Sequence, residues 1–338
     1  SGGVDDDVVD SLVESDVVSD FCLSSPQPAR AATSAIDASS TAKRVSTRAD
    51  DIGVPPAGVH NAQSVALSSL LNDYDKIMLD LDGCVWVGDE LTPLAEDALR
   101  ALRGSGKQLT FLTNDTRPTV EELVQKLWRL GVQTSVEEVV TVGTALRDHL
   151  SYVFPDGGLA YVSGSPAMVK FAKQGGFRVC EQLGPVEGAT VVVVAGHYDF
   201  DYRELTLATQ AVLAGAELIA CGLDATFPMP DGPWPATGAL VAAVEYATGV
   251  KAVNVGKPAP AIFETAIAAG AESAQIERSR VLMIGDRVDA DVAGAHQIGI
   301  DAAVVLTGAS DREAALRGHA GKPPIAVADT LAQLVLES

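Results

Sequence analysis

Two aspartates near the start of a regular part of the chain have the spacing of a reactive pair. They stand in the run Asp80-Leu81-Asp82-Gly83, directly after the apolar residues 77–79. Side chains two residues apart on an extended segment point to the same side. Two neighbouring carboxylates repel each other unless a cation or a proton compensates their charge. The run therefore indicates a metal site or an acid–base pair, although Asp-Gly is also a common turn dipeptide.

A second acidic run follows another apolar segment. Asp286 and Asp291 follow residues 281–284, which read as a buried strand. If Asp286 converges with Asp80 and Asp82, the three residues form a cluster of hard oxygen ligands. Such a cluster suits Mg²⁺, which takes one or two carboxylates together with the phosphate of a substrate. The sequence therefore indicates a Mg²⁺ site.

Two further motifs could bind phosphate. Thr113-Asn114 ends a predicted strand, where a hydroxyl and an amide can donate hydrogen bonds, although either residue could instead cap a helix. Gly256-Lys257-Pro258 stands before a predicted helix, so its ammonium group and the helix N-terminus could neutralise a phosphate. A lysine in such a place is otherwise most often a surface residue.

Strands and helices that alternate along the chain would position these residues. Strands are predicted at 76–81, 108–113, 159–162, 190–195, 217–220, 281–284 and 302–306. Helices are predicted at 62–71, 93–103, 119–130, 204–214, 259–269, 291–298 and 330–336. This alternation predicts an α/β fold with a doubly wound, Rossmann-like parallel sheet. The four motifs lie at strand ends or before helices, and ligands of open α/β sheets bind at that edge.

The charge of the chain excludes several partners. Its 338 residues carry 24 Lys and Arg against 45 Asp and Glu, a net charge of −21. We therefore expect no binding to nucleic acid and none to anionic membranes. No apolar run reaches 18 residues, and the four cysteines are scattered, which predicts a cytoplasmic protein. An anionic substrate would need a local cation, either a metal or a placed lysine.

Taken together, the motifs resemble those of a known family. Asp-x-Asp-Gly, Thr-Asn, Gly-Lys-Pro and Gly-Asp-x4-Asp follow one another in the order of the haloacid dehalogenase superfamily, in its phosphatase branch. Residues 113 and 257 lie 144 positions apart, enough for an inserted domain. This layout is similar to the NagD-like subfamily with a C2-type cap, which includes p-nitrophenyl phosphatases and phosphoglycolate, pyridoxal-phosphate and glycerol-3-phosphate phosphatases.

The resemblance implies a division of the chain. Residues 71–141 and 249–338 would form the catalytic core, and residues 142–248 would form an α/β cap that determines the substrate. Residues 1–70 form an acidic tail rich in Ser and Ala, which we expect to be flexible. The caps of relatives often pair, so a homodimer through the cap is a possible assembly.

The resemblance also implies a role for each motif. Asp80 would be the nucleophile that forms an aspartyl phosphate, and Asp82 the general acid and then the base. Asp80, the Asp82 backbone carbonyl and Asp286 would hold Mg²⁺, and Asp291 would orient metal waters or Lys257. The phosphoryl oxygens would bind Thr113, Asn114 and Lys257. Other expected substrate contacts are Gly83, His197, Asp224, Met229 and Trp234, the last of which could equally be a packed hinge.

The expected activity is Mg²⁺-dependent hydrolysis of a small phosphorylated metabolite. Glycerol phosphate, phosphoglycolate, a sugar phosphate and a nucleotide monophosphate are all candidate substrates. Two alternatives remain: a phosphotransferase that uses the same residues, and a non-catalytic protein that binds a phosphometabolite. The chain departs from the subfamily at four positions. These are Cys84 for the usual Thr, Asp115 where Asn is frequent, Gly222 for Asn and Ala236 for Gly.

Overall fold

The computed structural model describes residues 66–229, 232–270 and 276–337. The predicted N-terminal tail therefore falls almost entirely outside the described residues. Within the described part, no helix is long and apolar enough to cross a membrane.

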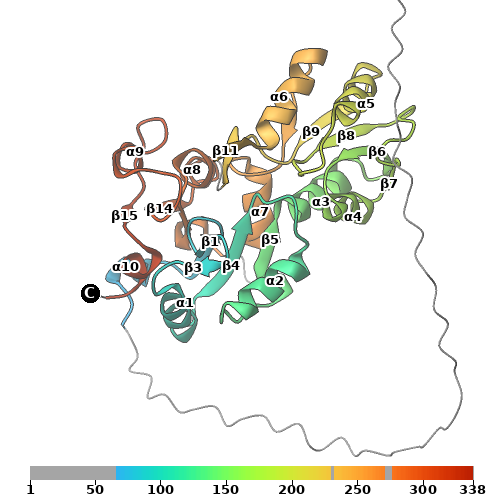
Figure 1. The fold of residues 1–338 in the computed structure, drawn as a ribbon. Coiled ribbons are helices and arrows are strands. Elements are labelled where there is room, and N and C mark those ends of the chain that lie inside the picture. The colour runs from blue at the N-terminus through green and yellow to red at the C-terminus, as the bar shows by residue number, and fades with distance from the viewer. Residues whose placement is uncertain (1–65, 230–231, 271–275, 338) are drawn as a thin grey trace, which may run out of the picture. The chain divides into compact units, whose positions relative to one another are not determined.

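A six-stranded sheet carries the first, second and fourth motifs (Figure 1). Its strand order is β15-β14-β13-β1-β4-β5, and every neighbouring pair is parallel. The strands are β1 (Lys76–Asp80), β4 (Gln108–Thr113), β5 (Val139–Thr141), β13 (Val281–Gly285), β14 (Asp301–Val305) and β15 (Ala326–Ala328). The chain runs outward from β1 through β4 to β5 and later returns to β13 on the other side of β1. The strand order therefore reverses at β1, where open α/β sheets form their ligand crevice.

Both faces of this sheet are covered by helices. Every residue of β1 is buried, as expected for a parallel strand between two helical layers. Ile77 and Leu79 face one apolar cluster with α1, α2 and α10, whereas Met78 faces a second cluster with α3, α7 and α8. These helices are α1 (Ala95–Gly104), α2 (Val120–Arg129), α3 (Val142–Val153), α7 (Pro260–Ala268), α8 (Ala293–Gln297) and α10 (Leu331–Val335). The α/β fold predicted from the alternation is thus confirmed.

A second parallel sheet lies between the second and third motifs in sequence, with the order β12-β9-β8-β6-β7. Its strands are β6 (Gly158–Ser163), β7 (Phe177–Val179), β8 (Val191–Val194), β9 (Glu217–Ala220) and β12 (Val253–Asn254). Its helices are α4 (Pro166–Gln174), α5 (Tyr202–Leu213) and α6 (Thr237–Thr248). The antiparallel hairpin of β10 (Thr226–Met229) and β11 (Gly232–Pro235) leads into α6. Strand β12 belongs to this sheet although it lies beyond the boundary expected at residue 249.

The remaining elements are short. They are η1 (Ser69–Asp73), β2 (Trp86–Val87), β3 (Glu90–Leu91), η2 (Val136–Glu138), η3 (Arg278–Arg280), the π-helical turn η4 (Val288–Val292) and α9 (Arg312–Arg317).

The helix predicted at 62–71 is wrong in the part that the structure describes. Leu67 forms an antiparallel bridge with Leu336, and only the 3₁₀ turn η1 follows. The Ser68 N–H donates to the Val335 carbonyl, and the Glu337 N–H donates to the Ala66 carbonyl. The backbone therefore satisfies its hydrogen bonds with the C-terminal segment instead of within a helix.

Candidate active site

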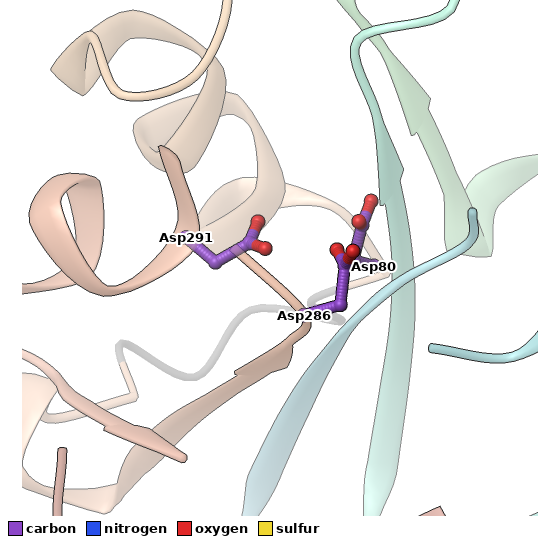
Figure 2. Close-up of side chains that lie close together, drawn as sticks. All are labelled: Asp80, Asp286 and Asp291. Carbon is purple, nitrogen blue, oxygen red and sulfur yellow. The ribbon is translucent and has the colours of Figure 1, made fainter. Parts of the chain in front are cut away.

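Three aspartates converge at the carboxyl edge of the six-stranded sheet (Figure 2). Asp80 ends β1, Asp286 follows β13, and Asp291 lies in the π-helical turn η4. One carboxylate oxygen from each lies within 4.8 Å of the others. Strands β1 and β13 are neighbours, which brings Asp80 and Asp286 together. A π-helical turn is a rare feature that is frequent at functional sites, and here it carries Asp291.

Lys257 reaches into this aspartate cluster from the loop before α7. Its Nζ lies 2.6 Å from Asp80 Oδ1 and 2.8 Å from Asp291 Oδ1. The lysine side chain is buried, and burial alone would lower its pKa. The charges of Asp291 and Asp80 outweigh this effect and raise the pKa of Lys257, so that the ammonium stays charged.

The aspartate cluster is short of positive charge. Asp80, Asp286 and Asp291 are all buried, and three carboxylates against one ammonium leave a charge of −2. Burial raises the pKa of Asp80, which Lys257 opposes. Burial and the charge of Asp291 raise the pKa of Asp286 to about 6. Oxygen Oδ1 of Asp286 is buried and has no hydrogen-bond partner among the described residues. A hard divalent cation such as Mg²⁺ would supply both the missing charge and the missing partner, so these residues fit the metal.

Glycines and a backbone amide hold Asp286 in place. A Cβ atom on Gly308 would lie 2.0 Å from Asp286 Oδ2, and one on Gly83 would lie 2.5 Å from it. Gly83 also has a φ of +83°, and its carbonyl accepts a hydrogen bond from the Thr307 hydroxyl. The Ala309 N–H donates to Asp286 Oδ2 over 2.6 Å. Gly83 thus lies against a possible metal ligand.

The loop of Thr307, Gly308 and Ala309 was missed by the sequence reasoning. A signal was present, because this Thr-Gly-Ala-Ser run follows the strand predicted at 302–306, like the other polar motifs.

Asp82 lies apart from the aspartate cluster. The Trp86 Nε1–H donates to Asp82 Oδ1 over 2.8 Å. The Asp82 side chain faces solvent in a groove, yet the surrounding protein displaces enough water to raise its pKa. The Trp86 hydrogen bond opposes this shift and the charge of Asp115 adds to it. The two carboxylates of the first motif therefore occupy different environments: Asp80 is buried beside a lysine, and Asp82 is exposed and accepts a hydrogen bond from Trp86.

Asn114 contacts the lysine loop through its side-chain amide. Its Oδ1 accepts from the Lys257 N–H over 2.8 Å, and its Nδ2 donates to the Lys257 carbonyl over 3.1 Å. The Thr113 side chain is buried at the end of β4, and its hydroxyl oxygen accepts from the Asp115 N–H. In this geometry Asn114 orients Lys257.

The cap residues expected to touch substrate have different surroundings. Asp224 forms an ion pair of 2.9 Å with Arg287, and its Oδ2 lies 3.4 Å from Asn114 Nδ2. The hairpin strand β10 ends at Met229, whose side chain lies outside the described part. Trp234 packs with Tyr198 and Phe227, with ring centroids 6.2 and 6.4 Å away.

His197 pairs with a buried glutamate of the cap. Its ring is 8% exposed, and its Nε2 lies 3.0 Å from Glu204 Oε2. The same glutamate oxygen accepts from the Ser163 hydroxyl, and its other oxygen accepts from Gln182. The structure therefore places His197 in a buried polar cluster inside the cap.

Comparisons with known proteins agree with this geometry. Residues 77–178 match the family model described as haloacid dehalogenase-like hydrolase, and residues 254–334 match one described as HAD-hydrolase-like. Mouse chronophin is 30% identical over 261 residues, which cover 75% of this chain and 88% of chronophin. The D-glycerol 3-phosphate phosphatase of Mycobacterium tuberculosis is 29% identical, over 80% of this chain and 74% of that protein.

Solved structures give the same result. The p-nitrophenyl phosphatase from Archaeoglobus fulgidus superposes with a TM-score of 0.70 at 25% identity, over 77% of this chain and 97% of that one. The glycerol phosphate phosphatase of M. tuberculosis in complex with magnesium gives a TM-score of 0.72 at 28% identity, over 80% and 79%. Motifs, site geometry and relatives agree: the chain belongs to the haloacid dehalogenase-like hydrolases and is a phosphoric monoester hydrolase of their NagD-like group.

Proposed function

We propose that this protein is a Mg²⁺-dependent phosphatase of small phosphate monoesters that works through an aspartyl phosphate on Asp80. The observation that supports this most is the pairing of a buried Asp80 with a buried, charged Lys257. Beside them lies an Asp286 oxygen that has no hydrogen-bond partner in the part of the chain that the structure describes. A site that only bound phosphate would have no need of a second carboxylate, Asp82, in a different environment.

In the first step, a carboxylate oxygen of Asp80 attacks phosphorus. The bond between phosphorus and the ester oxygen breaks, and its electron pair stays on that oxygen. Asp82 gives its proton to the same oxygen, so that the product leaves as an alcohol. The raised pKa of Asp82 suits this role, because it keeps the proton available.

In the second step, water attacks the phosphorus of the aspartyl phosphate. Asp82, now ionised, takes a proton from this water. The bond between phosphorus and the Asp80 oxygen breaks, which restores the Asp80 carboxylate and yields inorganic phosphate.

The remaining groups position and neutralise the phosphoryl group. Lys257 donates hydrogen bonds to its oxygens, and Asn114 fixes the backbone that carries this lysine. Thr113 lies at the tip of β4, next to the strand that ends in Asp80. Phosphoryl transfer depends mainly on such positioning and charge neutralisation.

Asp80, Asp286 and the backbone carbonyl of Asp82 would hold Mg²⁺, with Asp291 beside them. When bound, this ion offsets the negative charge of the phosphoryl oxygens.

The proposed substrate is a small phosphorylated metabolite. The relatives include a D-glycerol 3-phosphate phosphatase and an acid sugar phosphatase, which supports a small polyol or sugar ester.

Phosphate release from a panel of small esters tests this function. Wild-type protein should release phosphate with Mg²⁺ and lose this activity with EDTA. Asp80→Asn should lose it in Mg²⁺ while its circular dichroism stays unchanged. If folded wild-type protein releases no phosphate from any ester in Mg²⁺, the proposal is wrong.

A further inference from the structure

Arg117 is a cation beside Asp82, the proposed general acid. Its own charge is already neutralised by Asp115. Its Nε lies 2.7 Å from Asp115 Oδ1, and its Nη2 lies 2.8 Å from Asp115 Oδ2. This two-point pairing matches the fork of the guanidinium to the carboxylate. The Arg117 backbone N–H also donates to Asp115 Oδ1 over 3.0 Å, which fixes the aspartate within its own turn.

The pair lies where the leaving group of a substrate would lie. Arg117 and Asp115 line an open groove of about 910 Å³ together with Asp82. Asp82 must stand next to the ester oxygen that it protonates, so the rest of the leaving group extends into this groove or under the adjoining cap residues. The guanidinium carbon of Arg117 also lies 5.1 Å from the ring centroid of Tyr198.

The other cations of the groove offer little to an anion near Asp82. Lys126 donates to the Gly88 carbonyl, lies 3.3 Å from an Asp89 carboxylate and stacks 4.3 Å from the Trp86 ring centroid. Arg129 has no hydrogen-bond or ion-pair partner among the described residues. It lies at the last position of α2, about 14 Å along the helix axis from the first.

Carboxylates therefore outnumber cations in the groove. Its carboxylates are those of Asp82, Asp89, Asp115 and Glu122, and its cations are Arg117, Lys126 and Arg129. A second negative charge on the leaving group would meet carboxylates near Asp82, because Arg117 and Lys126 are already paired and Arg129, unpaired in the described part of the chain, lies at the far end of α2.

Beside this groove, the cap offers the aromatic rings of Tyr198, Phe227 and Trp234. Tyr198 and Phe227 also lie against the Arg117 guanidinium. Such rings suit the C–H groups of an uncharged polyol or sugar.

We infer that Asp115, by neutralising Arg117, makes this phosphatase prefer esters with an uncharged leaving group. Esters whose leaving group carries a carboxylate are disfavoured. The inference rests on the proposed phosphatase function and names the substrate class of the same site. It makes Asp115 a specificity-determining residue.

Two matched pairs of esters test the selection. In the first pair, 2-hydroxyethyl phosphate has a hydroxymethyl group where 2-phosphoglycolate has a carboxylate. In the second pair, glycerol 3-phosphate and 3-phosphoglycerate differ by the same replacement. Wild-type protein should show a kcat/KM at least about tenfold higher for the uncharged member, equal to about 1.4 kcal/mol.

Asp115→Asn should free the charge of Arg117. The ratio of kcat/KM, charged ester over uncharged ester, should rise by at least about tenfold, or about 1.4 kcal/mol. The ratio cancels any change in the chemistry that both esters share, including a change in the proton affinity of Asp82. The double variant Asp115→Asn/Arg117→Gln should lose the gain.

Glu122→Gln is the matched control. It removes one negative charge from the same groove, and glutamine can still accept the Thr119 N–H bond of the capping box at the start of α2. It leaves the Asp115 pairing intact, so its ratio should stay near that of the wild type.

Two outcomes would overturn the inference. One is a wild-type preference for the carboxylate esters, and the other is a ratio that changes as much in Glu122→Gln as in Asp115→Asn. Both differ from failure of the proposed function, in which wild-type protein hydrolyses neither these esters nor any other.

Discussion

Around Asp286, the backbone leaves no space for added side chains. Gly308→Ala would place a Cβ 2.0 Å from Asp286 Oδ2, so the carboxylate would have to move. A misplacement of about 1 Å at a catalytic group costs about 100-fold in rate. We therefore expect kcat/KM for phosphate release to fall by about 100-fold.

Gly104→Ala is the control for this substitution. Gly104 ends α1, and a Cβ there meets no atom of the described residues within 4 Å. Phosphate release should stay at the wild-type rate. Equal losses in both variants would show that the crowding at Asp286 does not matter.

The shortage of positive charge at the three aspartates predicts stabilisation by metal. Mg²⁺ binds only the folded cluster, so saturating Mg²⁺ should raise Tm by about 3 °C or more in a thermal melt. Asp286→Asn should remove most of this rise in Tm, because it removes the charge of the carboxylate to which the buried oxygen Oδ1 belongs. Asp289→Asn removes a charge from an exposed side chain and should keep the rise. A Tm that is insensitive to Mg²⁺ in the wild type contradicts the metal site.

Among the elements, α7 ends against a buried lysine. Lys76 opens β1, and its Nζ donates to the carbonyls of Ile267 and Ala269 over 2.9 and 2.6 Å. The lysine thus satisfies carbonyl groups at the helix end that lack a partner within the helix. It joins the strand that bears Asp80 to the helix that follows the Lys257 loop.

Burial lowers the pKa of Lys76 to about 8. Between that value and its unfolded pKa of about 10.4, the unfolded state binds more protons than the folded state. Stability from this group therefore rises as pH increases through this window.

The pH dependence can be measured by urea unfolding. The unfolding free energy of the wild type minus that of Lys76→Met should increase by about 2 kcal/mol from pH 7 to pH 10. Lys251→Met removes the same charge from an exposed side chain, and its difference should stay flat. A flat difference for Lys76→Met as well would show that its ammonium loses nothing on burial.

At the scale of the whole molecule, an ion pair joins a loop after a strand of the cap sheet to a loop after a strand of the six-stranded sheet. Asp224 comes after β9, and Arg287 comes after β13. Both side chains are partly exposed, and Asp224 also lies near Asn114. Because Arg287 follows Asp286 in sequence, this pair connects the cap directly to the aspartate cluster.

A double-mutant cycle tests this connection. Asp224→Asn and Arg287→Met should each lower kcat/KM by about tenfold, and the double variant should be no worse than either, a coupling of about 1.4 kcal/mol. The exposed pair of Arg312 and Asp329 provides the comparison, with coupling near zero. Additive losses at Asp224 and Arg287 would mean that the two residues act independently.

The sequence predicted what depends on local patterns. Strand β4 has the predicted bounds, 108–113. Strand β1 ends at Asp80, one residue before the predicted end at residue 81. Apolar runs identify buried strands, and polar residues directly after them identify the binding edge, because parallel strands end on the same side of a sheet. The fold class followed from such runs, and the family from the resemblance of the four motifs. Of the three aspartates expected to converge, the structure brings Asp80 and Asp286 together, whereas Asp291 takes the place expected for Asp82.

Only the tertiary structure decided the contacts between distant segments. Asn114 and Lys257 are 143 positions apart, and their pairing depends on how strands and loops pack. The same holds for Gly308 against Asp286, for Asp224 with Arg287, and for residues 66–68, which bond to the C-terminal segment. Local periodicity reports which face of an element is buried, whereas the partner that covers it is selected by the packing of the whole chain.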